Sequence, residues 1–495
     1  MGRGDIAGRM ITGDILELLS PEEMGEADRQ TIAAGTPGYR LMQRAGQAVA
    51  VVAAGMVPVG SRVVVLAGPG NNGGDGFVAA RLLQARHYPV RLALMGEAKA
   101  LSGDAALMAG RWKGKVAPLA PAVLDGAGVV IDALLGAGLV RPLSGGAAEM
   151  VAEIGRRGLP VVAVDVPSGV DGDTGAILGT APDAVATVTF FRKKPGHLLL
   201  PGRLKCGAVV VADIGIPDSV LPAVAPDVFE NAPALWLDRF PRPRPEGHKY
   251  SRGHVLVAGG GEMTGAARLA ARAARRIGAG LVTIAAPDAA LAVYRAGDPG
   301  TIVQSLGRFE AMLADPRHNA VLVGPGAGGD DETRRLVRAA LAAGRSCVLD
   351  AGALTAFAGT AEDLFSGLSD KALLTPHDGE LARLFGPLPG SRLERARAAA
   401  ARCKAVVLLK GADTVIAHPD GRAAINANAP PWLATAGAGD VLAGMAAGLL
   451  AQGMDCFYAA AAAVWLHGAA ATLVGPGLIA EDLGETLPQL LKGLQ

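Results

Sequence analysis

The sequence has few cysteines, and no two of them are close together. Cys206, Cys347, Cys403 and Cys456 form no CxxC pair. Structural zinc sites and disulfide frameworks are built from closely spaced cysteines, so this spacing argues against both. Free thiols persist in a reducing compartment, and we therefore expect a cytoplasmic protein.

An excess of one charge is also lacking. Lys and Arg total 47 and Asp and Glu total 46, which gives a formal net charge of +1 at pH 7. No long block of like charge indicates a nucleic-acid or membrane surface, so we expect small-molecule ligands and neither of those partners. An anionic ligand would have to be bound by nearby backbone N–H groups and side chains, because the net charge of the chain does not attract it. These totals leave homo-oligomerisation open.

The start of the chain, residues 1–20, lacks the continuous apolar segment of a signal peptide, so none is expected. A later stretch, residues 456–474, is long and apolar enough to cross a membrane, but most of it is alanine. Alanine-rich helices interrupted by glycine are common inside large α/β domains. We therefore predict a buried core helix there rather than a membrane span.

The length of the chain and its apolar pattern indicate how many domains it has and of what class. The 495 residues exceed what one hydrophobic core usually supports, so two domains are expected. Short β-branched runs alternate with helical segments rich in Ala, Arg and Leu, which predicts an α/β fold with parallel sheets and crossover helices. Prolines and charges replace this periodicity near residues 231–253. We place the boundary there, which gives domains 1–230 and 231–495.

Glycines and acids gather where the expected strands end. The strand at residues 62–67 is followed by GPGNNGGDGF, in which Gly68, Gly70 and Gly73 match GxGxxG before a predicted helix that begins at Asp75. Backbone N–H groups at a helix start can cradle a phosphate. A plain tight turn is the alternative, but it would not explain five glycines, which cost entropy. Asp75 in such a cradle needs a helix cap, a hydroxyl or a cation nearby.

Two further acids end neighbouring strands, Asp132 in IDALLGAG and Asp165 in VDVPSGVDGDTG. The carboxyl ends of parallel strands meet at one edge of a sheet, so both carboxylates can point into one crevice. Loop capping is the simpler role for either acid alone. Three converging polar segments favour a ligand site instead.

These segments, with LSPEEMGEADRQTIAAGTPGYRLMQRAG, closely resemble the YjeF N-terminal domain, the epimerase half of the NAD(P)H-hydrate repair enzymes, over roughly residues 19–216. The resemblance implies a Rossmann-like three-layer domain that binds hydrated NADH or NADPH and a potassium ion. Gln43 stands where the family usually has Glu. The resemblance implies Asp165 as the acid/base group and Asn72, Asp132 and Ser168 as potassium ligands. The implied substrate residues are Asn71, Asn72, Gly73, Gly74, Asp75, Gly136, Ala137, Gly138, Leu139, Val140, Arg141, Pro142 and Asp165.

The second half carries ATAGAGDVLAGMAAGLLAQG, which places a loop of small residues and then Asp440 at the start of an apolar helix. Backbone N–H groups there can receive charge on a transferring phosphoryl group, while the acid meets a substrate hydroxyl. A capped helix start without a ligand is the alternative. The stretch LLKGADTVIAHPDG reads as a hairpin with an available lysine, and His377 precedes a helix that it could simply cap.

Together these segments resemble the ribokinase-like dehydratase domain of the same enzymes, over roughly residues 249–490. The resemblance implies phosphorylation of the hydrate by ADP or ATP, with magnesium, followed by loss of phosphate. The nucleotide contacts it implies are Lys410, Gly411, Ala412, Asp413, Thr414 and Gly439. The hydrate contacts it implies are Ala266, Gly326, His377 and Asp440, with Asp440 activating the hydroxyl. NANAPPWLAT departs from the family pattern and puts contacts around residues 428–432 in doubt.

The sequence thus predicts a bifunctional enzyme that interconverts the R and S hydrates of NAD(P)H and dehydrates the S form. One alternative is a GxGD-type vitamin or sugar kinase with an accessory nucleotide-binding domain, because such kinases share the second fold. Another makes the first domain a non-catalytic binding module. A conventional dehydrogenase is the weakest alternative, since a lone GxGxxG is not specific.

Overall fold

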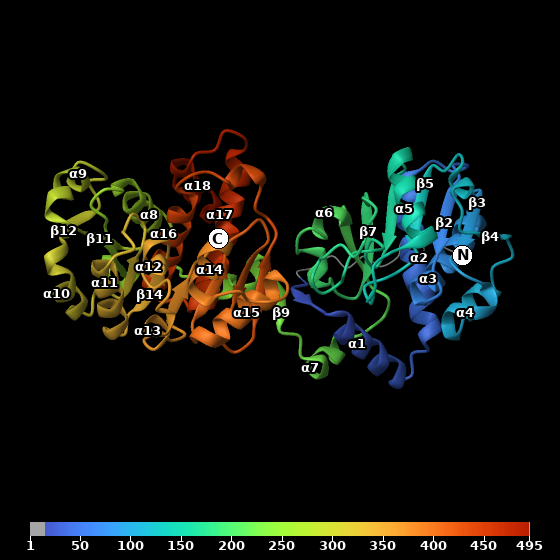
Figure 1. The fold of residues 1–495 in the computed structure, drawn as a ribbon, viewed down its shortest axis with the longest axis horizontal. Coiled ribbons are helices and arrows are strands. Elements are labelled where there is room, and N and C mark those ends of the chain that lie inside the picture. The colour runs from blue at the N-terminus through green and yellow to red at the C-terminus, as the bar shows by residue number, and fades with distance from the viewer. Residues whose placement is uncertain (1–14, 495) are drawn as a thin grey trace. The chain divides into compact units, whose positions relative to one another are not determined.

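The computed structural model describes residues 15–494 and divides into two compact units, Met1–Val228 and Phe229–Gln495 (Figure 1). The predicted domain boundary falls two residues beyond this division. Most of the start that was predicted to carry no signal peptide lies outside the described residues. Both units are α/β, as predicted, and each is described here by itself.

The first unit is built on a parallel sheet with strand order β4-β3-β2-β5-β6-β7-β8. The chain leaves β2 toward β3 and β4, then returns to β5 on the other side of β2, so loops diverge at the carboxyl ends of β2 and β5. Ligands of open α/β sheets bind at such a point. The strands are β1 (Glu17–Leu18), β2 (Val63–Ala67), β3 (Val90–Leu94), β4 (Val116–Pro118), β5 (Val129–Ala133), β6 (Val161–Val164), β7 (Ala186–Phe190) and β8 (Ala208–Ala212).

Alternate residues of β2 show why this unit has three layers. Val63 and Val65 pack into one core with the helices α2 and α3, whereas Val64 and Leu66 pack into another with α5. Both faces of the strand are buried, so its sequence is continuously apolar. The helices are α1 (Pro21–Ala33), α2 (Gly38–Met56), α3 (Asn71–Ala85), α4 (Gly103–Gly110), α5 (Gly145–Arg157), α6 (Arg203–Cys206) and α7 (Leu221–Val224).

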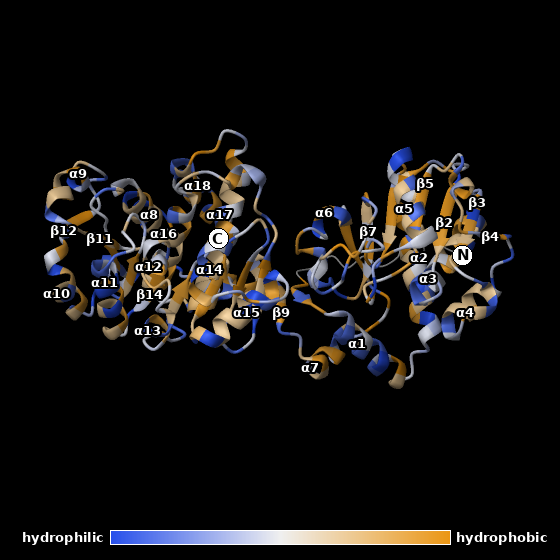
Figure 2. Cartoon of the chain, in the orientation of Figure 1, coloured by the Kyte–Doolittle hydropathy of each residue, from blue (hydrophilic) through white to orange (hydrophobic). Residues whose placement is uncertain are grey.

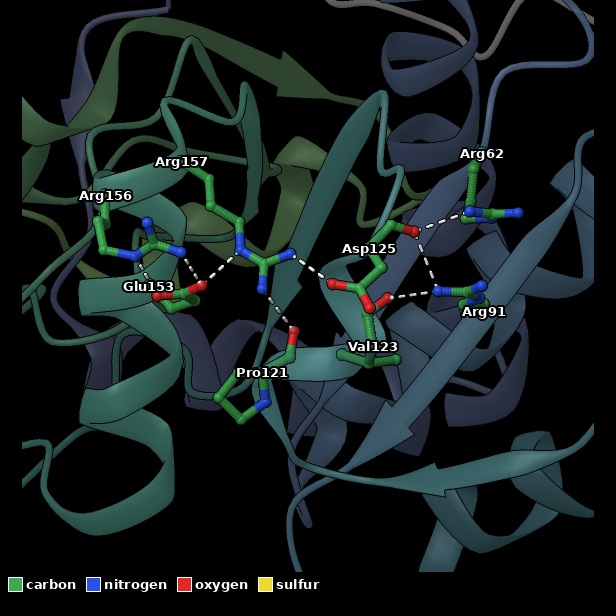
Figure 3. Close-up of polar contacts among 8 residues, drawn as sticks. All are labelled: Arg62, Arg91, Pro121, Val123, Asp125, Glu153, Arg156 and Arg157. Carbon is green, nitrogen blue, oxygen red and sulfur yellow. Dashed lines mark hydrogen bonds and ion pairs between the residues drawn. The ribbon is translucent and has the colours of Figure 1, made fainter.

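Arginines tie down the amino ends of the central strands in this unit (Figure 3). The backbone oxygen of Asp125 accepts hydrogen bonds from Arg62 Nη1 at 2.7 Å and Arg91 Nη1 at 3.0 Å. Its carboxylate accepts one from Arg157 Nη1, at 2.8 Å, which follows from Arg157 lying in the last turn of α5. Structural contacts therefore occupy the amino ends of these strands, and the loops of interest lie at their carboxyl ends.

The second unit has the strand order β9-β18-β17-β16-β15-β14-β13-β10-β11-β12. In this order, every neighbouring pair from β16 through β15, β14, β13, β10 and β11 to β12 is parallel. The pairs β16–β17 and β17–β18 are antiparallel, which confirms the predicted hairpin. The strands are β9 (Val228–Glu230), β10 (His254–Ala258), β11 (Leu281–Ala286), β12 (Ile302–Ser305), β13 (Ala320–Val323), β14 (Ser346–Leu349), β15 (Ala372–Leu374), β16 (Val406–Leu409), β17 (Thr414–Ala417) and β18 (Ala423–Asn426).

Alanine and glycine let the helices of the second unit approach closely. A Cβ on Gly444 of α16 would stand 2.1 Å from the backbone oxygen of Ala270 in α8, so only glycine fits there. The helices are α8 (Thr264–Arg276), α9 (Leu291–Arg295), α10 (Phe309–Ala314), α11 (Asp331–Ala342), α12 (Gly352–Thr355), α13 (Ala361–Phe365), α14 (Asp378–Phe385), α15 (Arg392–Cys403), α16 (Ala438–Ala451), α17 (Cys456–Val474) and α18 (Ala480–Gly493).

The helix α17 is the apolar stretch that could imitate a membrane span. By length and composition it passes that test, and among the described residues it is the one helix that does. Most of its side chains are buried in the core with α16 and the sheet, which confirms the predicted core helix. Figure 2 shows the same pattern, with hydrophobic colour concentrated on the strands and on the helices α16 and α17.

Candidate functional site

The glycine-rich segment after β2 differs from the prediction in where its helix begins. The helix α3 starts at Asn71, not at Asp75, so Asn71 and Asn72 with the following glycines form its first turn. A Cβ on Gly68 would lie 1.6 Å from the backbone oxygen of Leu134, and one on Gly73 would lie 1.9 Å from that of Gly68. Backbone packing against the loop after β5 therefore requires Gly68, and packing within the segment after β2 requires Gly73. The expectation of a ligand site did not include this structural reason for the glycines.

These loops border a cavity of about 840 Å³ in the first unit. Most of the predicted substrate residues line it, namely Asn71, Asn72, Asp75, Gly136, Ala137, Gly138, Leu139, Val140, Arg141, Pro142 and Asp165. Gly73 and Gly74 do not line it, and a Cβ on Gly74 would meet the Met42 sulfur at 2.6 Å. Those two positions serve packing in this structure.

Asp132 and Ser168, two of the predicted potassium ligands, are buried against each other. The Ser168 hydroxyl donates to Asp132 Oδ1 at 2.6 Å, and its backbone N–H donates to Oδ2 at 2.8 Å. Burial raises the pKa of Asp132, although these hydrogen bonds oppose the shift. The third residue, Asn72, has a buried amide nitrogen that finds no hydrogen-bond partner among the described residues. Its Oδ1 lies 3.2 Å from where a Cβ on Gly136 would stand, so glycine keeps space open beside that oxygen.

Asp165, directly after β6, forms an ion pair that sequence reasoning missed. Lys194 Nζ lies 2.5 Å from Asp165 Oδ1, and Lys194 is 1% exposed. Thr189 also donates to Oδ1, at 3.1 Å, and the backbone N–H of Ala137 donates to Oδ2 at 3.2 Å. Burial by itself would raise the pKa of Asp165, but the charge and hydrogen bond of Lys194 hold that pKa below its ordinary value. Asp165 is thus a fixed anion.

His197 fixes the backbone at this ion pair. The N–H of Lys194 donates to His197 Nδ1 at 2.8 Å, so Nε2 carries the proton and donates to the backbone oxygen of Asp165, also at 2.8 Å. Burial lowers the pKa of His197 to about 4, which keeps the ring neutral. Both residues come from FFRKKPGH, which begins at the last residue of β7, and a lysine shortly after a strand end was the signal that could have revealed the pair.

Asp75 lies buried near two other acids. Burial raises its pKa well above the ordinary value, and the charges of Asp165 and Asp28 add to that shift. Asp28 comes from α1 and lines the same cavity. Asp104 lines it as well, so four carboxyl groups border the cavity together with one buried lysine, Lys194.

In the second unit, charged side chains meet at the carboxyl ends of β14, β15 and β16. Lys410 Nζ lies 2.7 Å from Asp350 Oδ1 and 3.8 Å from Glu380 Oε2. Asp440, in the first turn of α16, has a pKa raised to about 6 by burial and by the charge of Asp350, with Lys410 opposing the shift. A Cβ on Gly439 would stand 3.7 Å from Lys410 Nζ. Asp350 and Glu380 were not predicted, although VLDAG ends a strand in an acid.

The predicted nucleotide loop, residues 410–414, is held in shape by its own atoms and by Arg392. Thr414 Oγ1 accepts from the N–H of Gly411 at 3.1 Å and donates to its backbone oxygen at 2.7 Å. Arg392 of α15 donates to the backbone oxygen of Lys410 at 3.1 Å and pairs with Asp413 at 3.0 Å. Ala412 lies between these anchored positions, and Arg392 carried no sequence signal.

Two of the predicted hydrate contacts, Ala266 and Gly326, are neighbours, since a Cβ on Gly326 would be 3.4 Å from that of Ala266. His377 caps the helix that it precedes, as one of its two expected roles: its Nδ1 accepts from the N–H groups of Gly379 and Glu380 at the start of α14. Its side chain is half exposed, and its Nε2 lies 3.6 Å from Glu380 Oε1.

The atypical segment near residues 428–432 is attached to α17. Asn428 accepts from Asn426 at 2.8 Å and donates to the backbone oxygen of Trp465 at 2.9 Å. Trp432 Nε1 donates to the backbone oxygen of Ala471 at 2.8 Å. These contacts explain locally how the departure from the family pattern is accommodated.

Comparisons with known proteins match both halves of the chain. The family model of the YjeF-related protein N-terminus matches residues 38–196, and that of NAD(P)H-hydrate dehydratase matches residues 254–489. The chain is 37% identical to the bifunctional NAD(P)H-hydrate repair enzyme Nnr of Salinibacter ruber, over 96% of each chain. It is 36% identical to the Nnr of Moorella thermoacetica, over 97% of each chain. A solved ADP/ATP-dependent NAD(P)H-hydrate dehydratase from Bacillus subtilis, crystallised with ATP/Mg²⁺, is 30% identical and covers 52% of this chain and 96% of its own, with a TM-score of 0.46.

Proposed function

The chain belongs to the family of bifunctional NAD(P)H-hydrate repair enzymes, and from that premise we propose that it repairs hydrated NADH and NADPH in two steps. The first unit interconverts the R and S epimers. The second dehydrates the S epimer to NAD(P)H at the expense of ADP or ATP. The observation that carries the proposal is that each unit has its own lysine–carboxylate ion pair at the carboxyl ends of its strands, with a buried lysine in the first unit and a partly buried one in the second.

For the first unit, inversion at the hydroxyl-bearing carbon requires a proton on the departing oxygen and stabilisation of the cation that remains. The cavity of about 840 Å³ is within the size range of small-molecule sites. Asp165 is fixed as an anion there and suits the developing positive charge. The loop of residues 136–142 and the first turn of α3 would hold the rest of the hydrate.

We propose potassium as the cation of this unit. Asn72, Asp132 and Ser168 offer amide, carboxylate and hydroxyl oxygens, which are hard donors. Gly136 keeps the space beside Asn72 Oδ1 clear, as a cation site there would need. When bound, the ion would supply positive charge that lowers the repulsion among the carboxylates.

For the second unit, the hydroxyl of the S hydrate is phosphorylated, phosphate then leaves, and the nicotinamide ring is restored. Asp440 accepts the hydroxyl proton, because it lies in the first turn of α16 beside Lys410. The N–H groups at the start of α16 and the Lys410 ammonium stabilise charge on the transferring group. In the proposal, Gly439 and the loop of residues 410–414 bind the ADP or ATP. Magnesium would accompany this phosphoryl donor.

The proposal places this chemistry in the cytoplasm. Its support is that the four cysteines are free thiols among the described residues. The substrates are small molecules, and the proposal needs no nucleic acid or membrane.

The test uses separated R and S hydrates of NADH with the full chain, first with ADP and then with ATP. NADH is followed by its near-ultraviolet absorbance. The S hydrate should yield NADH only with a phosphoryl donor, and the R hydrate should convert to S without one. A chain that phosphorylates a vitamin or a sugar and leaves both hydrates unchanged would contradict the proposal.

A further inference from the structure

Asp28 is a carboxyl group of the cavity for which the sequence predicted no role, although it lies in the segment LSPEEMGEADRQTIAAGTPGYRLMQRAG. The helix α1 carries Met24, Asp28 and Ile32 at intervals of four residues, so they share one face of the helix, and all three line the cavity. Ser20 and Glu23 form a capping box that fixes where this helix begins. The position of Asp28 at the cavity wall is therefore set by a well-anchored helix.

Asp165 is poorly placed to carry a proton, although it was the predicted acid/base group. Its Oδ1 accepts from Lys194 and Thr189, and its Oδ2 accepts from the backbone N–H of Ala137. Protonation would break the ion pair with Lys194, which is 1% exposed. A group held in this way supplies a constant negative charge rather than a proton that comes and goes.

The charged groups around Asp28 and along its cavity come from several elements. Lys194 follows β7, Asp165 follows β6, Asp75 lies on α3, and Arg29 is its neighbour on α1. Asp104 of α4 and Arg141 line the same cavity. Arg29 points to Glu26 on the surface, with which it pairs at 2.7 Å. Burial raises the pKa of Asp28 to about 6; Lys194 opposes the shift and Asp165 adds to it. Burial also raises the pKa of Asp75 well above its ordinary value, and the charges of Asp165 and Asp28 add to that shift.

Resting on the proposed function, we propose that Asp28 is the catalytic residue that exchanges a proton with the hydroxyl of the bound hydrate, while Asp165 and Lys194 provide a fixed charge pair. The protonated Asp28 carboxyl gives its proton to the hydroxyl. The C–O bond breaks with its electron pair, water leaves, and the ring carbon and nitrogen become an iminium cation beside the Asp165 carboxylate. Water then adds to the opposite face of that carbon and returns one proton to Asp28, so atoms and charge balance.

The test compares the full chain with Asp28→Asn, with Asp28→Glu and with a control, Glu26→Gln, in the exchange of purified R hydrate. Glu26 lies on the same helix, pairs only with Arg29 and Gln30 in the described contacts, and does not line the cavity. Asp28→Asn should slow exchange by about 100-fold or more through kcat, with KM little changed. Asp28→Glu should restore part of the rate, and Glu26→Gln should match the original chain.

The pH profile separates catalysis from structure. The acid form of Asp28 is the reactive one, so kcat/KM of exchange should fall by about tenfold per pH unit above about 6. Asp28→Asn should remove that limb and Asp28→Glu should retain it. Dehydration of the S hydrate by the same samples reports that the chain is folded and active.

The outcomes distinguish the two claims. If the original chain exchanges neither hydrate, the proposed function of the first unit fails. If it does exchange them and Asp28→Asn keeps both the rate and the pH limb, the inference about Asp28 is wrong while the function stands. A slow Asp28→Asn variant that Asp28→Glu does not rescue, with the pH limb unchanged, would also overturn it.

Discussion

Asp165 has a backbone φ of 66°, a conformation that residues other than glycine seldom adopt. The hydrogen bond from His197 to its backbone oxygen and the ion pair with Lys194 hold it there. Local strain that surrounding contacts enforce in this way is typical of functional positions. At this one residue, geometry and charge are set by partners that come from a different strand.

We predict that Asp165→Asn reduces epimer exchange by about 100-fold or more, because the anion beside the developing cation is lost. Unlike Asp28→Asn, it should keep a fall in rate with rising pH, but the fall should begin at a lower pH, because the charge of Asp165 contributes to the raised pKa of Asp28. The variant also leaves Lys194 buried without its partner, which should cost up to about 3–5 kcal/mol of unfolding free energy. Chemical denaturation and hydrate exchange measure the two effects.

A matched control is the double variant Asp165→Asn with Lys194→Gln. It removes the unpaired charge, so it should regain stability but not exchange. A double variant that exchanges hydrates at the original rate would mean that the charge pair is structural only.

At Asp440 the predicted effect depends on pH. Its pKa is raised to about 6, so the carboxylate form that accepts a proton increases as pH rises through that value. Dehydration of the S hydrate with ADP should therefore rise by about tenfold per pH unit below about 6 and level off above it. Asp440→Asn should reduce dehydration by about 100-fold or more at neutral pH and leave epimer exchange unchanged. A flat profile between about pH 5 and about pH 8 would contradict the assignment.

Some site residues could be predicted and others could not, for a physical reason. Asp132 and Asp165 lie at the ends of strands, where the rule on ligand sites finds them, and Asp440 lies in the first turn of a helix. Asp350 directly follows β14, so the same rule could have found it, whereas Lys194, Asp28 and Glu380 reach these places from other segments. No local pattern encodes those distances, so only the folded chain brings them together.

Among elements, helix starts were the least predictable feature. The helix α3 begins four residues before the predicted Asp75 because Gly73 and Gly74 pack against backbone and Met42, which local propensity does not reveal. The strand-to-helix order, the hairpin of β16 and β17 and the core helix α17 followed from apolar periodicity and were confirmed. For His377 the sequence left two roles open, and the structure gives it the cap of α14.

The contact between α8 and α16 gives a prediction at this scale. Gly444→Ala would place a methyl group 2.1 Å from the backbone oxygen of Ala270, so the helices would have to separate. We expect a loss of about 1–3 kcal/mol in unfolding free energy. The matched control is Gly484→Ala in α18, where the nearest atom is Arg276 Cγ at 4.0 Å. The control should be neutral or stabilising by up to about 1 kcal/mol, and equal losses in both would refute the packing argument.

For the whole chain, each set of site residues lies within one unit, the first within residues 24–214 and the second within residues 266–440. We predict that Asp165→Asn and Asp440→Asn complement each other. Neither variant alone should repair an equal mixture of the hydrates completely, whereas the two together should convert all of it to NADH. Measuring the final NADH yield tests this, and a mixture no better than Asp165→Asn alone would argue against diffusion of the hydrate between chains.

The arginines that close the amino edge of the first sheet have a consequence for evolution of the molecule. Arg62, Arg91 and Arg157 donate hydrogen bonds to main-chain oxygens at the amino ends of the strands, and these contacts stabilise that end of the sheet. Substitutions in the loops at the carboxyl ends of the strands can therefore change substrate specificity without removing these stabilising contacts.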